Sequence, residues 1–236
     1  MAPSPNAASS PDPARLPAGL DVPDLPEHVN YLVIEGVIGA GKTTLAEMLG
    51  RVLEANVVRE QFEENPFLER FYDDRDRWAF QTQLAFLASR FRQQKDLGTR
   101  DLFHQVVISD YSFDKDRIFA HETLSGDELQ LYEALYQIME PNTPDPDLVV
   151  YLQSPVDRLM ANIRKRDREY ERGIDRDYIA SLQEAYETYF RHYRKSPLLV
   201  VRTDGLDFVE NDDHFEAIVR HITTAEATGR EVVGPV

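Results

Sequence analysis

Short apolar runs alternate along the chain with longer segments of helical periodicity. The runs are rich in Val, Ile and Leu, and we expect five buried strands at residues 31–36, 56–60, 105–110, 147–153 and 197–203. Strands that are apolar on both faces are typical of a parallel sheet covered by helices on both sides.

The segments between these runs show the spacing of amphipathic helices. The pattern predicts helices at about 42–54, 66–73, 76–97, 125–140, 155–166, 175–194 and 212–223. Alternation of strands and helices predicts an α/β fold with an open, doubly wound sheet of five parallel strands flanked by helices. Ligands of such sheets gather at the carboxyl ends of the strands, so we expect the loop after Glu35, Glu60 and Asp110 to lie together.

The two ends of the chain differ in composition from its middle. Residues 1–28 contain seven of the 14 prolines among small and polar residues, and this composition predicts a disordered tail. A shorter tail is expected at residues 225–236. The interpretation is a single domain at residues 29–224 between two tails.

Composition narrows the classes of function. The chain has no cysteine, which excludes disulfides and thiolate zinc sites, and no apolar run long enough to span a membrane. We therefore expect a cytoplasmic protein. Its 42 acidic and 26 basic residues give a net charge of −16, which disfavours nucleic acid and anionic membranes as partners. An anionic nucleotide would need a local cluster of positive charge.

The segment GVIGAGKT, residues 36–43, matches the complete phosphate-binding loop pattern, between a predicted strand and a predicted helix. Its glycines allow backbone N–H groups to converge on phosphate oxygens, the lysine supplies a cation, and the Thr43 hydroxyl can bind Mg²⁺. The ligand predicted is ATP with Mg²⁺. The expected ATP-binding residues here are Gly36, Gly39, Ala40, Gly41, Lys42, Thr43 and Thr44.

A phosphate-binding loop alone does not distinguish a kinase from an ATPase, a GTPase or a motor. The guanine-reading pattern Asn-Lys-x-Asp is missing from the sequence, which weakens the GTPase hypothesis. The choice among the other classes depends on the remainder of the site.

The segment VVREQFEENPFLERFYDDRDRWAFQTQLAFLASRF, residues 57–91, resembles the region after the second strand in the deoxyribonucleoside kinases. The resemblance favours the bacterial deoxyadenosine/deoxyguanosine kinase branch and extends from about Asn30 to Phe208. It implies a P-loop kinase fold with an Arg-rich helical lid. It also implies phosphoryl transfer from ATP to the 5′-hydroxyl of a deoxyribonucleoside, preferably a purine, in nucleotide salvage, by a homodimer.

The resemblance assigns roles on the acceptor side. Glu60 stands where the family places its general base, and Lys42 is the catalytic lysine of the loop. Tyr72 is implied to meet the sugar 3′-hydroxyl, and the Gln83 amide, with donors and an acceptor, to pair with the base. Further substrate-binding residues implied by the family are Arg90, seven positions after Gln83 on a helix, and Phe119.

A basic segment follows the fourth predicted strand. NIRKRDREYERGID, residues 162–175, is the local positive patch that an acidic chain needs in order to bind phosphates, because arginines pair well with phosphate oxygens. By resemblance it is the lid, in which Arg166 and Arg168 act on the transferred group and Glu171 pairs with Tyr72. The implied ATP contacts on this side are Arg164, Asp207 and Phe208.

One segment departs from the family pattern. After the third strand the family carries an acidic residue followed by Arg and Ser or Thr, whereas this chain has Asp110 followed by Tyr111. Asp110 is expected to support the metal, but the arginine's charge is missing. Either Lys115 or Arg117 restores that charge, or the protein is a slow kinase or a binder.

Two other functions stay open from the sequence. The chain could be another small-molecule P-loop kinase, such as a nucleoside monophosphate kinase, which would need additional positive charge for the acceptor phosphate. It could also be a non-catalytic nucleotide-binding protein that has kept the fold.

Overall fold

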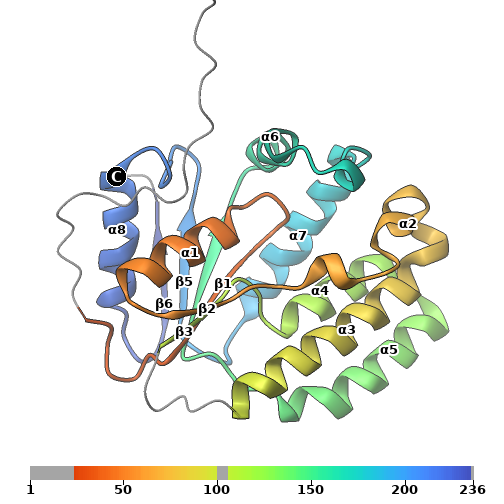
Figure 1. Cartoon of the computed structure of the whole chain (residues 1–236), viewed down its shortest axis with the longest axis horizontal. Coiled ribbons are helices and arrows are strands. Elements are labelled where there is room, and N and C mark those ends of the chain that lie inside the picture. The colour runs from red at the N-terminus through yellow and green to blue at the C-terminus, as the bar shows by residue number, and fades with distance from the viewer. Residues whose placement is uncertain (1–23, 100–105, 235–236) are drawn as a thin grey trace, which may run out of the picture.

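The computed structural model describes residues 24–99 and 106–234, which form a parallel sheet between layers of helices (Figure 1). The strands are β1 (Tyr31–Gly36), β2 (Asn56–Val58), β3 (Val107–Ser109), β4 (Leu148–Gln153), β5 (Leu198–Arg202) and β6 (Arg230–Val233). Their order in the sheet is β2-β3-β1-β4-β5-β6, and every neighbouring pair is parallel.

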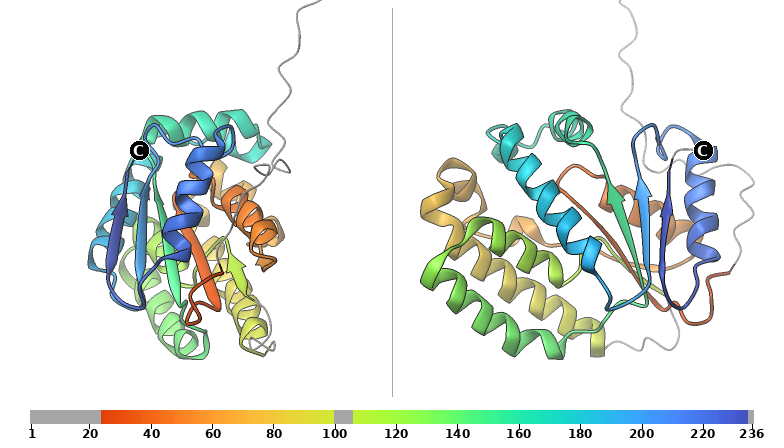
Figure 2. Two further views of the ribbon diagram at one scale, coloured as in Figure 1. Left: turned by 90° about the vertical axis from the view of Figure 1, so that its left-hand side faces the viewer. Right: turned by 180° about the vertical axis from the view of Figure 1, so that it is seen from behind.

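The helices cover both faces of the sheet. They are α1 (Lys42–Val52), α2 (Leu68–Asp73), α3 (Arg75–Thr99), α4 (Asp114–Thr123), α5 (Gly126–Met139), α6 (Val156–Arg166), α7 (Arg176–His192) and α8 (Asp212–Thr223), with short 3-10 turns at Phe62–Glu64, Glu140–Asn142 and Glu169–Glu171. Helices α1 and α8 lie on one side of the sheet, and α4 and α7 lie on the other, with α3 and α5 beyond them (Figures 1 and 2).

The central strands are apolar on both faces, as the sequence pattern predicted. All six residues of β1 are buried, and so are the first five of β4. Their side chains pack against both helical layers in a single core. The predicted α/β class with a parallel sheet is therefore confirmed.

Two elements correct the sequence prediction. The sheet has six strands instead of five, because β6 pairs with β5 inside the segment expected to be a C-terminal tail. Helix α4 was not predicted, since its sequence DKDRIFAHET is dominated by polar residues that turn out to be partly buried. Residues 1–23 of the predicted N-terminal tail lie outside the described residues.

The topology gathers three loops at one edge of the sheet. Strands β1, β2 and β3 are parallel neighbours, so the segments that follow them emerge together. These segments carry the phosphate-binding loop, Glu60 and Asp110, as the strand-end rule predicted. Among the described helices, none is long and apolar enough to cross a membrane.

Candidate active site

The phosphate-binding loop joins β1 to α1 and depends on glycine backbone geometry. Gly39 and Gly41 have φ angles of 85° and 95°, in the left-handed region that other residues rarely adopt. A Cβ atom on Gly39 would lie 2.6 Å from the carbonyl oxygen of Leu159 in α6. The loop therefore requires glycine here both for its conformation and for its close packing against α6.

Lys42 begins α1 and folds back over the loop. Its Nζ donates to the carbonyl oxygens of Gly36 at 2.7 Å and of Val37 at 3.1 Å. Burial lowers the pKa of Lys42 to about 7, and the nearby Lys115 ammonium adds to this effect. A bound polyphosphate would favour the charged form, so the lysine is placed to respond to the anion that the loop holds.

Asp110 follows β3 and connects the loop to the acceptor side. The Thr43 hydroxyl donates to its Oδ2, and the backbone N–H of Glu60 donates to its Oδ1 at 2.8 Å. The Asp110 carboxylate thus bridges the start of α1 and the segment that follows β2. Thr43 and Asp110 together present hard oxygen atoms of the kind that Mg²⁺ prefers.

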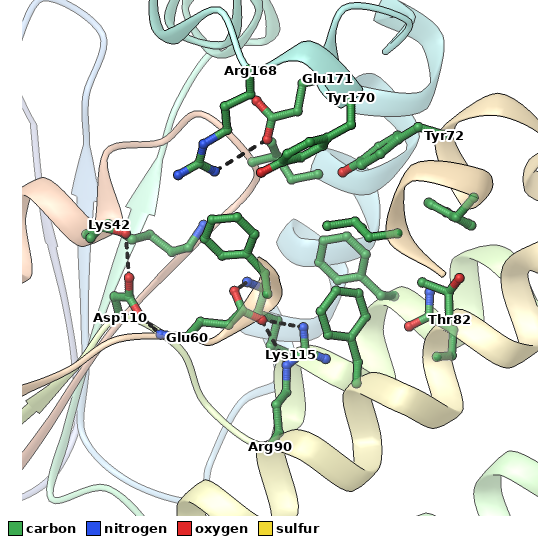
Figure 3. A pocket seen from close by; sticks show the side chains of 18 of the residues that line it. Lys42, Glu60, Tyr72, Thr82, Arg90, Asp110, Lys115, Arg168, Tyr170 and Glu171 are labelled. Atoms are coloured by element: carbon green, nitrogen blue, oxygen red, sulfur yellow. Dashed lines mark hydrogen bonds and ion pairs between the residues drawn. The ribbon is translucent and has the colours of Figure 1, made fainter. Parts of the chain in front are cut away.

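The Glu60 carboxylate lies between two cations (Figure 3). Arg90 donates to its Oε1 through Nε at 3.0 Å and Nη2 at 2.5 Å, and the Lys115 ammonium donates to its Oε2. Burial alone would raise the pKa of Glu60, but Lys115 and Arg90 outweigh it and hold that pKa well below its usual range. The Glu60 carboxylate is therefore an anion.

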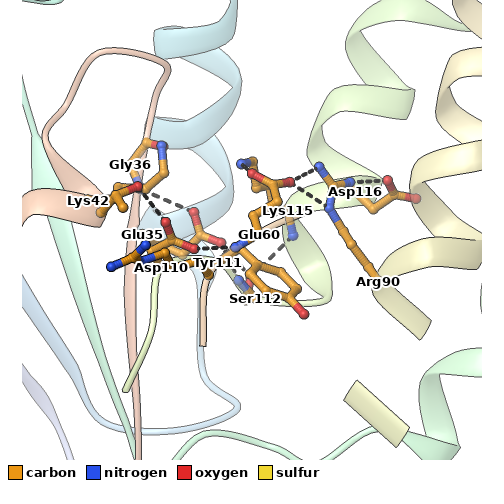
Figure 4. A network of polar contacts seen from close by, with 12 residues as sticks. Glu35, Gly36, Lys42, Glu60, Arg90, Asp110, Tyr111, Ser112, Lys115 and Asp116 are labelled. Carbon is orange, nitrogen blue, oxygen red and sulfur yellow. Dashed lines mark hydrogen bonds and ion pairs between the residues drawn. The ribbon is translucent and has the colours of Figure 1, made fainter. Parts of the chain in front are cut away.

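Arg90 is fixed on its far side as well. Its Nη1 contacts the fully buried carboxylate of Asp116, which also accepts a 2.5 Å hydrogen bond from the Tyr132 hydroxyl. The guanidinium stacks over the Phe86 ring, with 4.5 Å from Cζ to the ring centroid. Arg90 is thus held by the two carboxylates shown in Figure 4 and by an aromatic face, and it forms part of the pocket wall.

The pocket continues from Glu60 toward α3. Gln83 is 1% exposed and donates from Nε2 to the Thr123 hydroxyl at 3.1 Å, which leaves its buried Oε1 as an acceptor with no partner among the described residues. An acceptor of this kind in an aromatic pocket suits a nucleobase edge. Aromatic rings around it come from Phe62, Phe71, Tyr72, Phe86, Phe119 and Tyr170.

The lid lies across the pocket from Glu60 (Figure 3). Glu171 is 5% exposed and accepts two 2.6 Å hydrogen bonds from Arg166, and Arg168 approaches it to 3.6 Å. The rings of Tyr72 and Tyr170 stack beside them with 6.0 Å between centroids. The lid thus gathers two arginines, a carboxylate and a tyrosine hydroxyl over one pocket.

A second pocket opens on the other side of the phosphate-binding loop. Residues Asp207 to Glu210 form one wall, and the Phe208 ring lies against Gly41. From α6, the Asn162 side chain donates to the Gly39 carbonyl oxygen at 2.8 Å. This pocket meets the first at Lys42, Thr43, Arg166 and Arg168, so the two pockets share the place where phosphates would lie.

Comparison with known proteins accounts for this pair of pockets. The family model described as deoxynucleoside kinase matches residues 32–226. This chain belongs to the deoxynucleoside kinase family. A deoxyguanosine kinase of Bacillus subtilis (strain 168) is 38% identical over 197 residues, which are 81% of this chain and 95% of that protein.

Other relatives agree with this assignment. The kinase is 30% identical over 203 residues to a deoxyadenosine/deoxycytidine kinase of Bacillus subtilis (strain 168), over 83% of this chain and 92% of that protein. A solved structure of deoxyadenosine kinase from M. mycoides with bound dCTP superposes with a TM-score of 0.70 at 26% identity, covering 81% of this chain and 100% of that one.

The structure brings together most of the residues that the sequence suggested. In the kinase, one pocket is lined by Lys42, Thr43, Glu60, Tyr72, Gln83, Arg90, Asp110, Phe119, Arg166, Arg168 and Glu171. The second pocket is lined by the predicted residues Gly39, Ala40, Gly41, Thr44, Asp207 and Phe208. Gly36 lies beneath the loop and contributes its carbonyl oxygen to Lys42.

Arg164 lies apart from the other predicted ATP-binding residues. It is exposed and lines neither pocket, whereas Lys165 and Arg166 do. Two residues correspond to about 200° of rotation around a helix, so Arg164 points away from the side that Arg166 presents to the pocket. A cluster of basic residues in a sequence does not show which members share a face with the ligand.

Tertiary structure also determines which cation after β3 takes the place of the arginine in the family pattern. Tyr111, where the family pattern has arginine, is fully buried. Lys115 reaches Glu60, while Arg117 points outward and pairs with Glu133 at 2.7 Å. Of the two candidate cations, the structure therefore places Lys115 in the pocket and Arg117 outside it.

Sequence reasoning missed several residues of the site. Tyr170 stacks on Tyr72, and Phe62 lies under Arg168 with 4.3 Å from Cζ to the ring centroid. Arg158 and Asn162 lie on the side of α6 that faces the second pocket. The one available signal was the helical spacing from Arg158 to Asn162, four residues apart and hence on one face.

Proposed function

We propose that the kinase transfers the γ-phosphoryl group of ATP to the 5′-hydroxyl of a purine deoxyribonucleoside in nucleotide salvage. The observation that carries the proposal is the junction of two pockets at Lys42, with the buried Glu60 carboxylate on the acceptor side. Membership of the deoxynucleoside kinase family supports the reaction, and the deoxyguanosine and deoxyadenosine kinases among the relatives support the purine base.

The chemistry follows from these positions. Glu60 accepts the proton of the 5′-hydroxyl while the oxygen attacks the γ-phosphorus. The bond between the γ-phosphorus and its bridging oxygen breaks, and ADP leaves with that oxygen. Lys42, Arg166 and Arg168 neutralise the charge of the transferred group. The proton on Glu60 passes to water after the product leaves, which restores the carboxylate.

Mg²⁺ fits the pair formed by the Thr43 hydroxyl and the Asp110 carboxylate, which already contact each other. A site with one carboxylate and one hydroxyl obtains its other oxygens from water and from the nucleotide phosphates. When bound there, the metal would supply positive charge that neutralises the nucleotide phosphates. Asp110 also orients the Glu60 segment through the Glu60 N–H, so one residue would align both reactants.

The nucleoside is proposed to lie along the first pocket. Tyr72 and Glu171, which interact electrostatically, would bind the sugar 3′-hydroxyl. Gln83 would meet the base with its free Oε1, and Phe119 would stack on it. Asp207 and Phe208 would hold the adenine of ATP in the second pocket.

An acceptor that already carries a phosphate fits less well. A nucleoside monophosphate kinase needs unpaired positive charge on the acceptor side to hold that phosphate. Here Arg90 is neutralised by Glu60 and Asp116, and Lys115 is paired with Glu60. The acceptor side therefore suits a neutral nucleoside.

The resemblance to the family also supports a homodimer in the cytoplasm as the working form. Light scattering on the purified chain tests the dimer directly. A monomer at assay concentration would contradict it without affecting the proposed reaction.

A phosphorylation screen tests the function. The common deoxyribonucleosides, ribonucleosides and nucleoside monophosphates are each incubated with the kinase and Mg-ATP, and ADP formation is measured. Turnover with deoxyguanosine or deoxyadenosine above the others is expected. Turnover with a monophosphate alone, or no turnover with any acceptor, would overturn the proposal.

A further inference from the structure

The side chain of Lys115 is the starting point. It is buried at the beginning of α4, and its ammonium contacts Glu60 Oε2. It lines the same pocket as Lys42 and Arg168 (Figure 3), and Arg166 lines that pocket too. The proposed reaction needs the Glu60 carboxylate to accept a proton, yet the Lys115 ammonium is already paired with it. The role of Lys115 in the reaction therefore needs an explanation.

Both carboxylate oxygens of Glu60 accept hydrogen bonds from cations. Oε1 accepts from Arg90 and Oε2 accepts from Lys115. An acceptor hydroxyl can bind this carboxylate only by replacing or crowding one of the two cations. The question is which cation gives way.

Arg90 is held by two carboxylates, whereas Lys115 is held by one. Arg90 binds Glu60 and the buried Asp116 at once and stacks on Phe86, so its displacement would leave a buried carboxylate unpaired. The Lys115 ammonium is a point charge on a flexible stem. Its ion-pair partner in the described part of the chain is Glu60, and the Phe119 ring lies 5.8 Å away.

The pocket that Lys115 lines also extends to the phosphate-binding loop, because Lys42 and Thr43 line it too. Lys115 and Lys42 both line this pocket, and the buried Glu35 carboxylate interacts electrostatically with both ammonium groups. The γ-phosphoryl group of a nucleotide held by the phosphate-binding loop would introduce negative charge beside both. Movement away from Glu60 would therefore bring Lys115 toward the group that is transferred.

We propose that Lys115 is an exchangeable cap on Glu60 that yields Oε2 to the acceptor hydroxyl and then contacts the γ-phosphoryl group during transfer. The proposal rests on the proposed function. Lys115 is then a catalytic residue whose ammonium pairs first with Glu60 and then with the γ-phosphoryl group. The exchange also explains how a neutral nucleoside can bind beside a carboxylate that is already paired.

Steady-state kinetics of Lys115→Gln test the proposal. The glutamine amide can still donate to Glu60 but carries no charge, so it keeps the cap and loses the contact with the phosphoryl group. We expect kcat to fall by about 10²-fold, as for loss of a transition-state donor, with the KM for ATP changed by less than about threefold. The matched control is Arg117→Gln, two residues further on the same helix and paired with Glu133 outside the pocket, which should keep kcat.

Chemical rescue provides a second readout. In Lys115→Ala, added ethylammonium or propylammonium should restore part of kcat, and Lys115→Arg should keep more activity than Lys115→Gln. Neither effect is expected if Lys115 serves only to hold the fold. Melting temperatures of all variants identify any loss of folded protein, and the glutamine variant carries the test if the alanine variant is unstable.

The failing outcomes are distinct. If the parent enzyme phosphorylates deoxynucleosides and Lys115→Gln keeps kcat within about twofold of the Arg117→Gln control, the exchange is wrong although the function stands. Loss of kcat without rescue by amine or arginine, at unchanged melting temperature, would also reject the phosphoryl contact. Absence of turnover in the parent enzyme would overturn the proposed function itself.

Discussion

At the residue scale, Glu35 connects the two halves of the catalytic edge. This fully buried carboxylate accepts from the Gly36 N–H at 3.1 Å, and from the Ser112 N–H at 2.7 Å and hydroxyl at 2.8 Å (Figure 4). Burial raises the pKa of Glu35, whereas the Lys115 and Lys42 ammonium groups lower it. The carboxylate thereby ties the phosphate-binding loop to the segment that carries Asp110 and Lys115.

Replacing Glu35 with Gln should therefore destabilise the protein. The amide nitrogen would face backbone donors, and a buried donor without an acceptor costs about 1–3 kcal/mol of unfolding free energy. Urea unfolding measures the loss. The control Glu47→Gln breaks a more exposed pair with Arg59 and should cost about 1 kcal/mol or less. Equal effects of the two substitutions would contradict the connecting role of Glu35.

Glu60 can be tested by a change that keeps its shape. Glu60→Gln removes the proton acceptor, and kcat should fall by about 10²–10⁴-fold, the usual contribution of a general base. ATP affinity, measured by calorimetry, should change little because Glu60 lies on the acceptor side. The exposed Glu64, in the 3-10 turn that follows, provides the control Glu64→Gln. A loss in Glu60→Gln no larger than in that control would remove Glu60 from the mechanism.

At the scale of elements, the lid is bounded by two defined helix ends. Helix α6 ends at Arg166 and is followed by Asp167, whose φ of 45° is left-handed. Helix α7 begins after Asp175, whose side chain accepts from the Tyr178 N–H at 2.7 Å. Asp175 also pairs with Arg75 at the start of α3. These contacts fix where the lid begins and ends, while Arg166 and Arg168 line both pockets.

Loss of the cap on α7 should lower stability in a pH-dependent way. Asp175→Ala should cost about 1 kcal/mol near pH 7, and Asp175→Asn, which keeps a capping oxygen, only a few tenths. The hydrogen bond from the Tyr178 N–H lowers the pKa of Asp175. The stability that Asp175 contributes is therefore fully present above the pKa of an aspartate in the unfolded chain, about 3.9. This contribution is lost as the pH falls through the lower pKa of the folded state. Urea unfolding at neutral and acidic pH measures this, and a difference that grows on acidification would contradict the cap.

At the scale of the whole molecule, charge is distributed unevenly. The chain carries a net charge of −16, yet Lys42, Lys115, Arg166 and Arg168 line one pocket. The electrostatic field of the whole chain opposes the binding of an anionic nucleotide, whereas the field of these basic side chains in the pocket favours it. Basic side chains outnumber carboxylates in this pocket, whereas acidic residues outnumber basic ones over the whole chain.

Self-repulsion of this acidic surface predicts that salt stabilises the fold. Raising KCl from about 0.05 M to about 0.5 M should increase the melting temperature, with most of the gain at the lower concentrations, because the Debye length is already near 10 Å at 0.1 M. Differential scanning fluorimetry measures the shift. An equal osmolality of sorbitol controls for solvent exclusion. A melting temperature that falls with KCl would show that surface ion pairs outweigh the net charge.

The sequence by itself determined the fold class and the outline of the site. The five apolar runs became strands because burial on both faces depends on local composition. The phosphate-binding loop was readable because its function depends on backbone geometry encoded within eight consecutive residues, 36–43. Glu60 and Asp110 met because parallel neighbouring strands end at one edge.

Only the tertiary structure decided which charged side chains enter the site. Tyr111 turned into the core, Lys115 reached Glu60, and Arg117 and Arg164 pointed outward. The sequence also did not predict strand β6, because its mostly exposed residues show no apolar run. These residues form a strand by pairing with the open edge of β5. The direction of a side chain depends on where its helix starts and on what packs against it, and contacts between distant segments set both.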